Sequence, residues 1–299
     1  MLKNDSLRLL WVPIIALLTL ALSSCGIADT LANTAALPGG TPAKAAAGTV
    51  SVSFIDVGQA DSTLIQTENR AMLIDAGERA NGPAIIDYLI SQGVAKLDVV
   101  VATHPHADHI GGFPAIFDAF DVGTVVMPDA VHTTATFERF LDAVEASAAA
   151  VVPAVAGDII ELDDVVLTIV APNGGDYHSL NNYSVVIRMM HGDNAFIFAG
   201  DAEALSEGEM LQNGHNLSAN VLKVGHHGSV TSTSQAFLNA VRPSYAVISL
   251  GADNRYGHPH NDVTALLQNN GVRIYRTDMH GTVKIVSDGV ALYIQTERD

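Results

Sequence analysis

The spacing of apolar residues along the chain predicts both strands and helices. Apolar residues alternate with polar residues over 50–57, and they form a run over 97–102 that only Asp98 interrupts; both patterns predict strands. Residues 110–120 and 134–148 have instead the spacing of helices with one apolar face. Short strands and helices therefore alternate along the chain.

The same patterns continue to the C-terminus. We expect further helices over 83–91, 203–212, 232–241 and 262–269. We expect further strands over 63–66, 71–74, 122–127, parts of 151–170, 184–190, 195–199, 219–224, 245–250, 272–276, 281–287 and 290–295. Hairpins and strand–helix units are mixed, and the helices are numerous enough to cover sheet faces. This favours an α/β (α+β) domain over residues 49–299, a four-layer αββα sandwich of two mixed β-sheets with helices on the outer faces.

The first residues have the pattern of a secretory signal. A positively charged start precedes an apolar run over 9–22, and the sequence Leu-Ser-Ser-Cys follows, ending at Cys25. This predicts a signal peptide over 1–24. The ending resembles the lipobox of bacterial lipoproteins, which implies lipidation of Cys25 and export to the outer face of a bacterial membrane. An uncleaved membrane helix is the alternative, but the run is shorter than the ~20 residues that a span needs.

Between the predicted signal and the first strand, residues 25–48 are rich in Ala, Thr, Gly and Pro, as in a flexible tether that follows the lipidated cysteine. Cys25 is the only cysteine among 299 residues, which excludes intrachain disulfides and thiolate metal sites. The formal net charge is −17, which opposes loose binding to nucleic acid or to an anionic membrane.

The segment Thr103–Gly112 concentrates ionisable side chains directly after a predicted strand. It contains His104, His106, Asp108 and His109. Burying these groups is costly unless a cation compensates them. Imidazole and carboxylate together suit zinc, manganese or iron, and this set exceeds what one metal takes from one segment. The spacing therefore predicts two adjacent divalent metals, and hence hydrolysis.

The pattern His-x-His-x-Asp-His after a strand resembles the metallo-β-lactamase fold superfamily of metallohydrolases. The sequence Met-Leu-Ile-Asp-Ala-Gly resembles the superfamily's strand-Asp-x-Gly element, in which Asp75 would orient metal ligands. The sequence Phe-Ile-Phe-Ala-Gly-Asp resembles the strand that leads to the metal-bridging carboxylate, here Asp201. Taken alone, Asp201 would be interpreted as a helix N-cap. Because it follows the other motifs in the order found in the superfamily, we favour a metal ligand.

The resemblance implies two ligand sets. Metal one would be held by His104, His106 and Asp201, and metal two by Asp108, His109, Asp201 and His227. Whether His226 or His227 is the ligand stays open at this point; we favour His227, with His226 as a proton donor or phosphate contact. Many superfamily members have a further His where this chain has Asn181-Asn182, so metal one would keep an open position, with His178 as an outside candidate.

Three further motifs resemble a narrower group. They are Ile-Asp-Val-Gly-Gln-Ala-Asp-Ser at 55–62, Lys-x-x-His-His-Gly-Ser from Lys223, and Arg-Tyr-Gly-His-Pro-His at 255–260. Together they resemble the soluble hydrolase domain of ComEC-type DNA-internalisation competence proteins, over about Thr49–Gln295. That resemblance implies a nuclease or phosphodiesterase with two divalent ions, zinc or manganese; phosphorylcholine esterases are similar too. Competence proteins of this type carry the hydrolase domain beside a membrane channel. The segments predicted here are a signal, a tether and the hydrolase-like domain, so the resemblance does not imply transport.

We expect a metal-bridging hydroxide to attack phosphorus in the substrate. Lys223 would contact a phosphoryl oxygen, His258 would protonate the leaving oxygen, and Asn182 or Tyr256 would position the substrate. Asp56 and Asp61 would order the entry loop through turn hydrogen bonds. Elsewhere, His132 and His215 are expected to be solvated surface residues.

Several substrates and one non-catalytic role remain open. DNA suits the resemblance, but the net charge of −17 favours a small phosphodiester such as a nucleotide or a choline-phosphate headgroup. β-Lactam hydrolysis is a weaker alternative. A surface lipoprotein that binds a phosphate polymer and uses metal structurally is another, although an open coordination position argues for catalysis because structural sites are closed.

Overall fold

The computed structural model describes residues 48–299. The predicted signal peptide over 1–24, Cys25 and nearly all of the predicted tether lie outside the described residues. Within 48–299, no helix combines the length and the apolar character needed to cross a bilayer.

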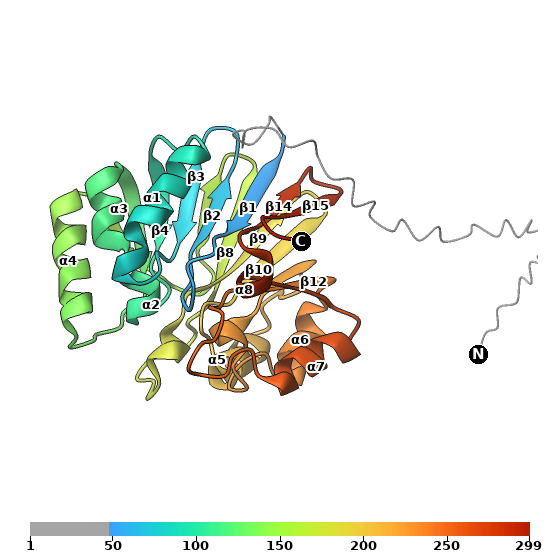
Figure 1. Ribbon diagram of the computed structural model, residues 1–299. Helices are drawn as coiled ribbons and strands as arrows, with labels where there is room; N and C mark the ends of the chain where they lie inside the picture. Colours follow the sequence, from blue (N-terminus) through green and yellow to red (C-terminus); the bar gives the residue numbers. More distant parts are fainter. Residues whose placement is uncertain (1–47) are drawn as a thin grey trace, which may run out of the picture. The chain divides into compact units, whose positions relative to one another are not determined.

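Two β-sheets form the centre of the described domain (Figure 1). The first has the order β15-β14-β1-β2-β3-β4-β5-β6, with parallel pairing from β3 to β6 and antiparallel pairing elsewhere. Its strands are β1 (Val50–Phe54), β2 (Thr63–Gln66), β3 (Ala71–Ile74), β4 (Leu97–Val101), β5 (Val122–Met127), β6 (Ala150–Pro153), β14 (Val283–Ser287) and β15 (Leu292–Thr296).

The second sheet has the order β13-β12-β11-β10-β9-β8-β7, parallel from β10 to β13 and antiparallel from β7 to β10. Its strands are β7 (Ile159–Leu162), β8 (Val165–Ala171), β9 (Val186–His191), β10 (Asn194–Phe198), β11 (Val221–Lys223), β12 (Tyr245–Ile248) and β13 (Arg273–Arg276). Both sheets are thus mixed, and the predicted hairpin around residues 191–194 is present as β9 and β10.

Apolar side chains between the sheets form one core, in which the rings of Phe54 and Phe198 lie 6.1 Å apart. Two further cores lie beneath the outer helices. Helices α1 (Gly82–Ser91), α3 (Phe113–Ala119) and α4 (Ala135–Ser147) cover the first sheet, and α5 (Ala204–Gln212), α6 (Gln235–Val241) and α7 (Asn261–Asn269) cover the second (Figure 1). The predicted four-layer αββα sandwich is confirmed.

The single helix predicted over 110–120 is wrong in its boundaries. The chain instead forms a short helix α2 (Ala107–Ile110), passes through Gly111 and Gly112, and starts α3 at Phe113. A Cβ atom on Gly112 would lie 2.0 Å from the carbonyl oxygen of Ala76, so only glycine permits this approach. These glycines therefore bring α2 against the turn after β3.

Short helical turns complete the described chain. The sequence patterns did not predict α8 (Thr277–His280) or the 3₁₀ helices η1 (Arg79–Asn81), η2 (Leu180–Tyr183) and η3 (Gly225–Gly228). Two of these turns, η2 and η3, lie beside the predicted metal ligands. Loops that follow the parallel strands β3 and β4 of one sheet, and β10, β11 and β12 of the other, carry nearly all of the residues discussed next.

Candidate metal centre

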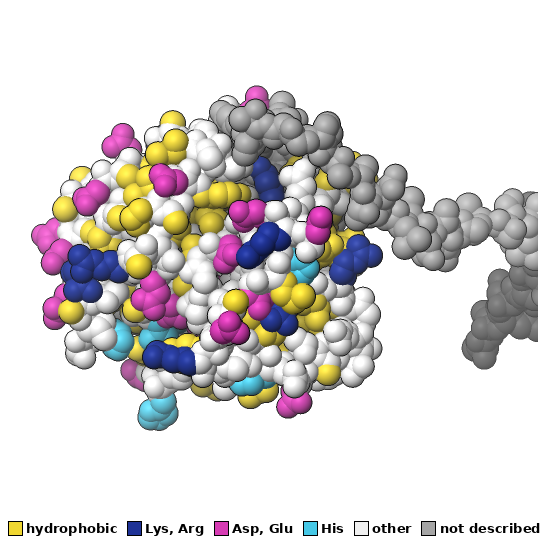
Figure 2. Space-filling model, in the orientation of Figure 1, with side chains coloured by type: hydrophobic (Ala, Val, Ile, Leu, Met, Phe, Trp, Pro, Cys, Tyr) yellow, Lys and Arg dark blue, Asp and Glu magenta, His cyan; other side chains and the backbone are white. Residues whose placement is uncertain are grey.

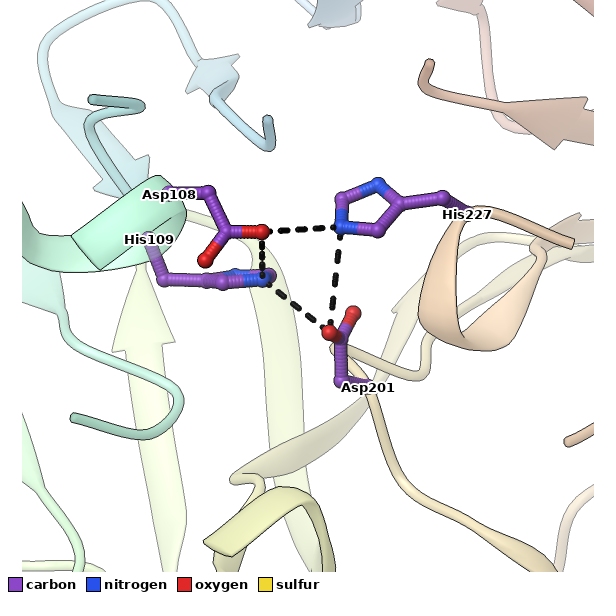
Figure 3. Close-up of side chains that lie close together, drawn as sticks. All are labelled: Asp108, His109, Asp201 and His227. Carbon is purple, nitrogen blue, oxygen red and sulfur yellow. Dashed lines mark ion pairs between the residues drawn. The ribbon is translucent and has the colours of Figure 1, made fainter. Parts of the chain in front are cut away.

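Two groups of imidazole and carboxylate side chains meet at one carboxylate. Asp108, His109, Asp201 and His227 offer ligand atoms that all lie within 4.8 Å of one another, and His104, His106 and Asp201 do the same. In the first group, α2 supplies Asp108 and His109, the loop after β10 supplies Asp201, and the turn after β11 supplies His227 (Figure 3). The structure thus brings together all six sequence-predicted ligands, in the two predicted sets. Metal binding by them stays a prediction.

In the larger group, the ring nitrogens point at the carboxylates. His109 Nε2 lies 3.3 Å from Asp201 Oδ2, and His227 Nε2 lies 3.3 Å from Asp108 Oδ2 and 3.7 Å from Asp201 Oδ2. Yet His109 Nε2, His227 Nε2 and Asp201 Oδ1 are buried without a hydrogen-bond partner. Buried polar atoms are nearly always paired. The unpaired ring nitrogens of His109 and His227, which both lie beside the Asp201 carboxylate, therefore fit a cation.

The smaller group is arranged in a similar way. The hydroxyl of Thr103 donates to Asp75, so its oxygen is free to accept from His104 Nδ1 at 3.1 Å. This leaves the lone pair of His104 Nε2 directed at Asp201 Oδ2, 3.7 Å away, and at His106 Nδ1, 2.9 Å away. Two imidazole nitrogens this close either share a proton or face a common cation. The group therefore fits a second metal ion beside the first.

Asp75 lies behind the ligands and orients two of their segments. Its carboxylate accepts from the backbone N–H of Thr103, from the Thr103 hydroxyl and from His109 Nδ1, each at 2.8 Å. Because Nδ1 of His109 donates its proton to Asp75, Nε2 presents a lone pair to the cluster. Asp75 has a φ of 59°, an uncommon left-handed conformation for a non-glycine residue. The geometry matches the orienting role that the resemblance implied.

Charge coupling in the cluster shifts several pKa values. Burial would lower the pKa of His109, but Asp201, Asp75 and Asp108 raise it well above its usual value. For His104, burial and the neighbouring His109 lower the pKa well below its usual value. The carboxylate of Asp201 keeps a pKa well below the ordinary range despite its burial, because His109 and His227 stabilise the anion. The cluster thus attracts positive charge, which a proton on His109 or a bound dication would supply.

The turn after β11 separates the two adjacent histidines. His226 and His227 have φ of 48° and 53°, a strained left-handed conformation of the kind that is common at functional sites. His227 is 2% exposed and donates from Nδ1 to the carbonyl of Ser249 at 2.9 Å, which leaves Nε2 for the cluster. The side chain of His226 is 24% exposed; its Nδ1 lies 2.9 Å from Thr231 Oγ1 and its Nε2 lies 3.9 Å from Asp201 Oδ2. His227 therefore lies within the larger group of potential ligands, whereas His226 lies at the more exposed edge of the cluster, called the open side below.

Lys223 and Asp61 lie elsewhere than the sequence led us to expect. Each is only 3% exposed, and the Lys223 ammonium forms an ion pair with Asp61. The Lys223 ammonium is therefore buried against Asp61. This position disfavours the contact with a phosphoryl oxygen that we expected of it. The Asp61 carboxylate is directed at Lys223 and His227, with its Oδ1 3.4 Å from His227 Nδ1, which disfavours the turn hydrogen bond that we expected of it. Asp56 does make the expected turn bond, accepting from Gly58 N at 3.3 Å.

Of the two adjacent asparagines, Asn181 lies against the open side. Asn182 is buried, donates to Glu203 at 3.1 Å and accepts from the N–H of Ser206 at 3.2 Å, which disfavours the predicted contact with substrate. The Nδ2 atom of Asn181 lies 3.4 Å from the His226 ring, and its buried Oδ1 has no partner. The two asparagines are adjacent in the sequence, but only the conformation of η2 shows that Asn181 is the one that lies beside His226.

His258 lies close to both histidines of the β11 turn. Its ring centroid lies 5.6 Å from that of His226, and the Tyr256 ring stacks on it at 5.7 Å. Burial, then the charges of His227 and His226, lower the pKa of His258 to about 4, so the ring is neutral near pH 7. A neutral imidazole donates a hydrogen bond but is a weak proton source, which disfavours the predicted role as general acid.

The other three histidines considered from the sequence differ in their surroundings. His132 is only half-buried, as expected near the surface, but its ring lies 6.1 Å from that of His106, which makes it a neighbour of the centre. His215 bonds to Asn173 at 2.7 Å, and His178 is exposed. Neither His178 nor His215 belongs to a potential ligand group among residues 48–299.

Comparison with known protein sequences finds relatives that include competence and recombination proteins. The chain is 33% identical over 251 residues to ComE operon protein 3 of Bacillus subtilis and 32% identical over 235 residues to Competence protein ComA of Neisseria gonorrhoeae. Each alignment covers 78% of this chain and 32% of the relative. Recombination protein 2 of Haemophilus influenzae is 29% identical over 239 residues. The chain spans about a third of the length of these relatives.

Solved structures share the fold at low identity. The metallo-beta-lactamase fold protein YhfI of Bacillus subtilis matches with a TM-score of 0.55 and 12% identity, over 79% of this chain and 99% of that protein. CmlA, a diiron beta-hydroxylase of Streptomyces venezuelae, matches with a TM-score of 0.52 and 13% identity, over 79% of this chain and 53% of that protein. The sequence model of the metallo-beta-lactamase superfamily matches residues 55–252, which include both ligand groups. The chain therefore belongs to the metallo-β-lactamase superfamily and has a candidate metal site of its metal-dependent hydrolases.

Proposed function

We propose that this protein is a dinuclear metal-dependent hydrolase of phosphodiester bonds. The observation that carries the proposal is the meeting of two ligand groups at Asp201, beside the unpaired ring nitrogens of His109 and His227. His104 Nε2, His106 Nδ1 and Asp201 would hold one ion; Asp108, His109, Asp201 and His227 would hold the other. A shared carboxylate is suited to ions about 3.5–4 Å apart. Bound there, zinc or manganese would activate a water and polarise the ester.

Substrate would reach the centre from the side of Asp108, His106 and His226. These side chains are partly exposed, whereas His104, His109, His227 and Asp201 are buried. Contact with Thr231 orients His226, whose partly exposed ring would contact a phosphoryl oxygen. His258 and Tyr256 lie beside His226 and would position the leaving group through hydrogen bonds and packing.

A purely structural metal site is disfavoured. Structural sites close their coordination shell with protein ligands. Here the smaller group offers three side chains, and His106 is only half-buried. Asn181, which stands in the segment where many superfamily members have a histidine, lies against His226. An accessible, incompletely filled position supports catalysis over binding alone.

The surface favours a short phosphodiester over long DNA. The net charge is −17, and Figure 2 shows acidic side chains spread over the visible face, with Lys and Arg in small separate groups. Non-specific DNA binding depends on a field of Lys and Arg. The names of two relatives, a competence protein and a recombination protein, favour DNA instead. Both substrates fall within the proposed reaction, and a choline-phosphate ester is a second candidate of the same chemistry.

A substrate panel tests this proposal. The full-length chain, stripped of metal and then reloaded with zinc or manganese, is offered bis-p-nitrophenyl phosphate, single-stranded DNA, duplex DNA and p-nitrophenyl phosphorylcholine. Metal-dependent cleavage of DNA supports the nuclease form, and cleavage of the small esters alone supports a phosphodiesterase. No metal-dependent turnover of any of the four would overturn the proposal and favour a binding protein.

A further inference from the structure

A pair of opposite charges is buried beneath the metal centre. Asp61 precedes β2 and Lys223 ends β11, so the two come from different sheets. Both are 3% exposed, and the Lys223 ammonium contacts Asp61 Oδ2. Burying two charges costs more than an exposed pair would gain, so a buried pair needs a further reason for its presence.

Asp61 contacts most segments that carry ligands of the larger group. Its backbone N–H donates to the carbonyl of Asp108 at 3.1 Å, and its carbonyl accepts from Gly77, in the turn after Asp75, at 2.8 Å. Its Oδ1 lies 3.4 Å from His227 Nδ1, and its Oδ2 lies 3.9 Å from His109 Nδ1. One residue thus joins α2, the turn after β3 and the turn after β11.

The two acceptors around His227 fix its tautomer. Nδ1 donates to the carbonyl of Ser249, and the carboxylate of Asp61 is a second negative partner for the same N–H. With the proton held on Nδ1, Nε2 presents its lone pair, and a carboxylate behind the ring makes that nitrogen a stronger ligand. Lys223 holds the other carboxylate oxygen, which fixes the direction in which Oδ1 points.

The pair adds an orienting carboxylate without adding net charge. Asp61, Asp75, Asp108 and Asp201 place four carboxylates in and around one cluster, together with one buried ammonium. Because Lys223 offsets the charge of Asp61, His227 gains a carboxylate partner while the net charge that the centre presents to bound cations stays the same. Lys223 would thus act on the centre through Asp61, without contact with substrate.

We propose that Asp61 and Lys223 are a positioning pair: Lys223 holds the Asp61 carboxylate, and Asp61 holds His227 in the orientation that binds the metal of the larger group. This inference rests on the dinuclear centre of the proposed function. It differs from a purely structural ion pair in one respect. A neutral replacement of both charges can preserve stability, but it removes the charged partner of His227.

The test compares Asp61→Asn, Lys223→Met and the double variant in the full-length chain. Glu207→Gln is the matched control, because Glu207 is also a buried carboxylate, accepts from the N–H of Ser234 at 2.8 Å, and belongs to neither ligand group. Each protein is assayed for thermal unfolding without metal, and for metal per chain by elemental analysis across a chelator series. Neither readout depends on turnover.

Lys223→Met should lower Tm most, because Asp61 is left buried without its cation. The double variant should recover most of the Tm that Lys223→Met loses. It should nevertheless release the metal of the larger group at a free-metal concentration about 10–100-fold higher than the wild type, which is the usual loss when an orienting partner of a ligand is removed. Glu207→Gln should release metal like the wild type. A double variant with wild-type metal affinity would show the pair to be structural only. A wild-type chain that holds fewer than two metals would overturn the dinuclear centre itself, and this inference with it.

Discussion

The two ligand groups that share Asp201 differ in how they are supported. In the larger group, His109 and His227 are buried and each donates from Nδ1 to a buried acceptor, Asp75 or the Ser249 carbonyl. In the smaller group, only His104 is supported in this way, through Thr103. His106 is half-buried, its Nδ1 faces the cluster, and its ring lies near that of His132.

This difference separates a rigid half of the centre from an accessible half. Every orienting contact of the larger group comes from a strand end or from the backbone, so its geometry is set when the sheets pack. In the smaller group, His106 is partly exposed, and Asp201, which both groups share, lies beside His226. We infer that the larger group binds its metal more tightly and that the smaller group meets the substrate.

The largest effect is expected from the carboxylate that both groups share. Asp201→Asn removes the bridging charge and should reduce metal-dependent turnover by ~10³-fold or more, beyond the 10²–10³-fold typical of losing one electrostatic donor. Metal content should fall below two per chain while circular dichroism stays that of the wild type. Wild-type turnover in this variant would end the dinuclear mechanism.

A smaller effect should come from His106→Ala, which affects only the accessible half. Metal content should fall from two to one per chain, and turnover by ~10²-fold, because one of the two electrostatic stabilisers is lost. Elemental analysis measures the content directly. If the variant loses both ions, the two halves are not separable and the comparison fails.

Asp75→Asn acts on the rigid half without removing a ligand. The amide of the introduced Asn accepts less strongly from His109 and Thr103 than the carboxylate does. The affinity for the metal of the larger group should therefore fall by ~10–100-fold. Turnover should return when zinc or manganese is added in excess. Turnover that stays low at saturating metal would mean that Asp75 takes part in chemistry beyond orienting His109.

The smallest effect is expected at His258. A general acid contributes ~10²–10⁴-fold, but a ring with a pKa of about 4 is already neutral near pH 7. His258→Gln should therefore lower kcat by about 10-fold or less and leave the pH dependence of kcat unchanged between about pH 5 and pH 8. A lost basic limb in that profile would restore His258 as the proton donor.

The sequence predicted the parts of the centre that follow from local order. The predicted ligands His104 to His109, Asp75 and Asp201 follow the ends of β4, β3 and β10, and the packing of the two sheets brings these ends together. The αββα layers followed from the mixture of hairpins and strand–helix units. These features need only local patterns and the resemblance.

Contacts between distant segments were beyond the sequence patterns. Asp61 and Lys223 are 162 positions apart, and their pairing depends on how the two sheets pack. The break between α2 and α3 depends on the approach of Gly112 to Ala76, which helical periodicity does not register. The left-handed turn at His226 and His227 likewise decided which ring faces the cluster.

The most direct test of the account is a metal titration of the stripped full-length chain, with turnover of bis-p-nitrophenyl phosphate followed at each added equivalent of zinc or manganese. The account predicts little turnover at the first equivalent, a rise to the maximum at the second, and no rise in Asp201→Asn. Full turnover at one equivalent, or turnover without metal, would contradict the dinuclear centre.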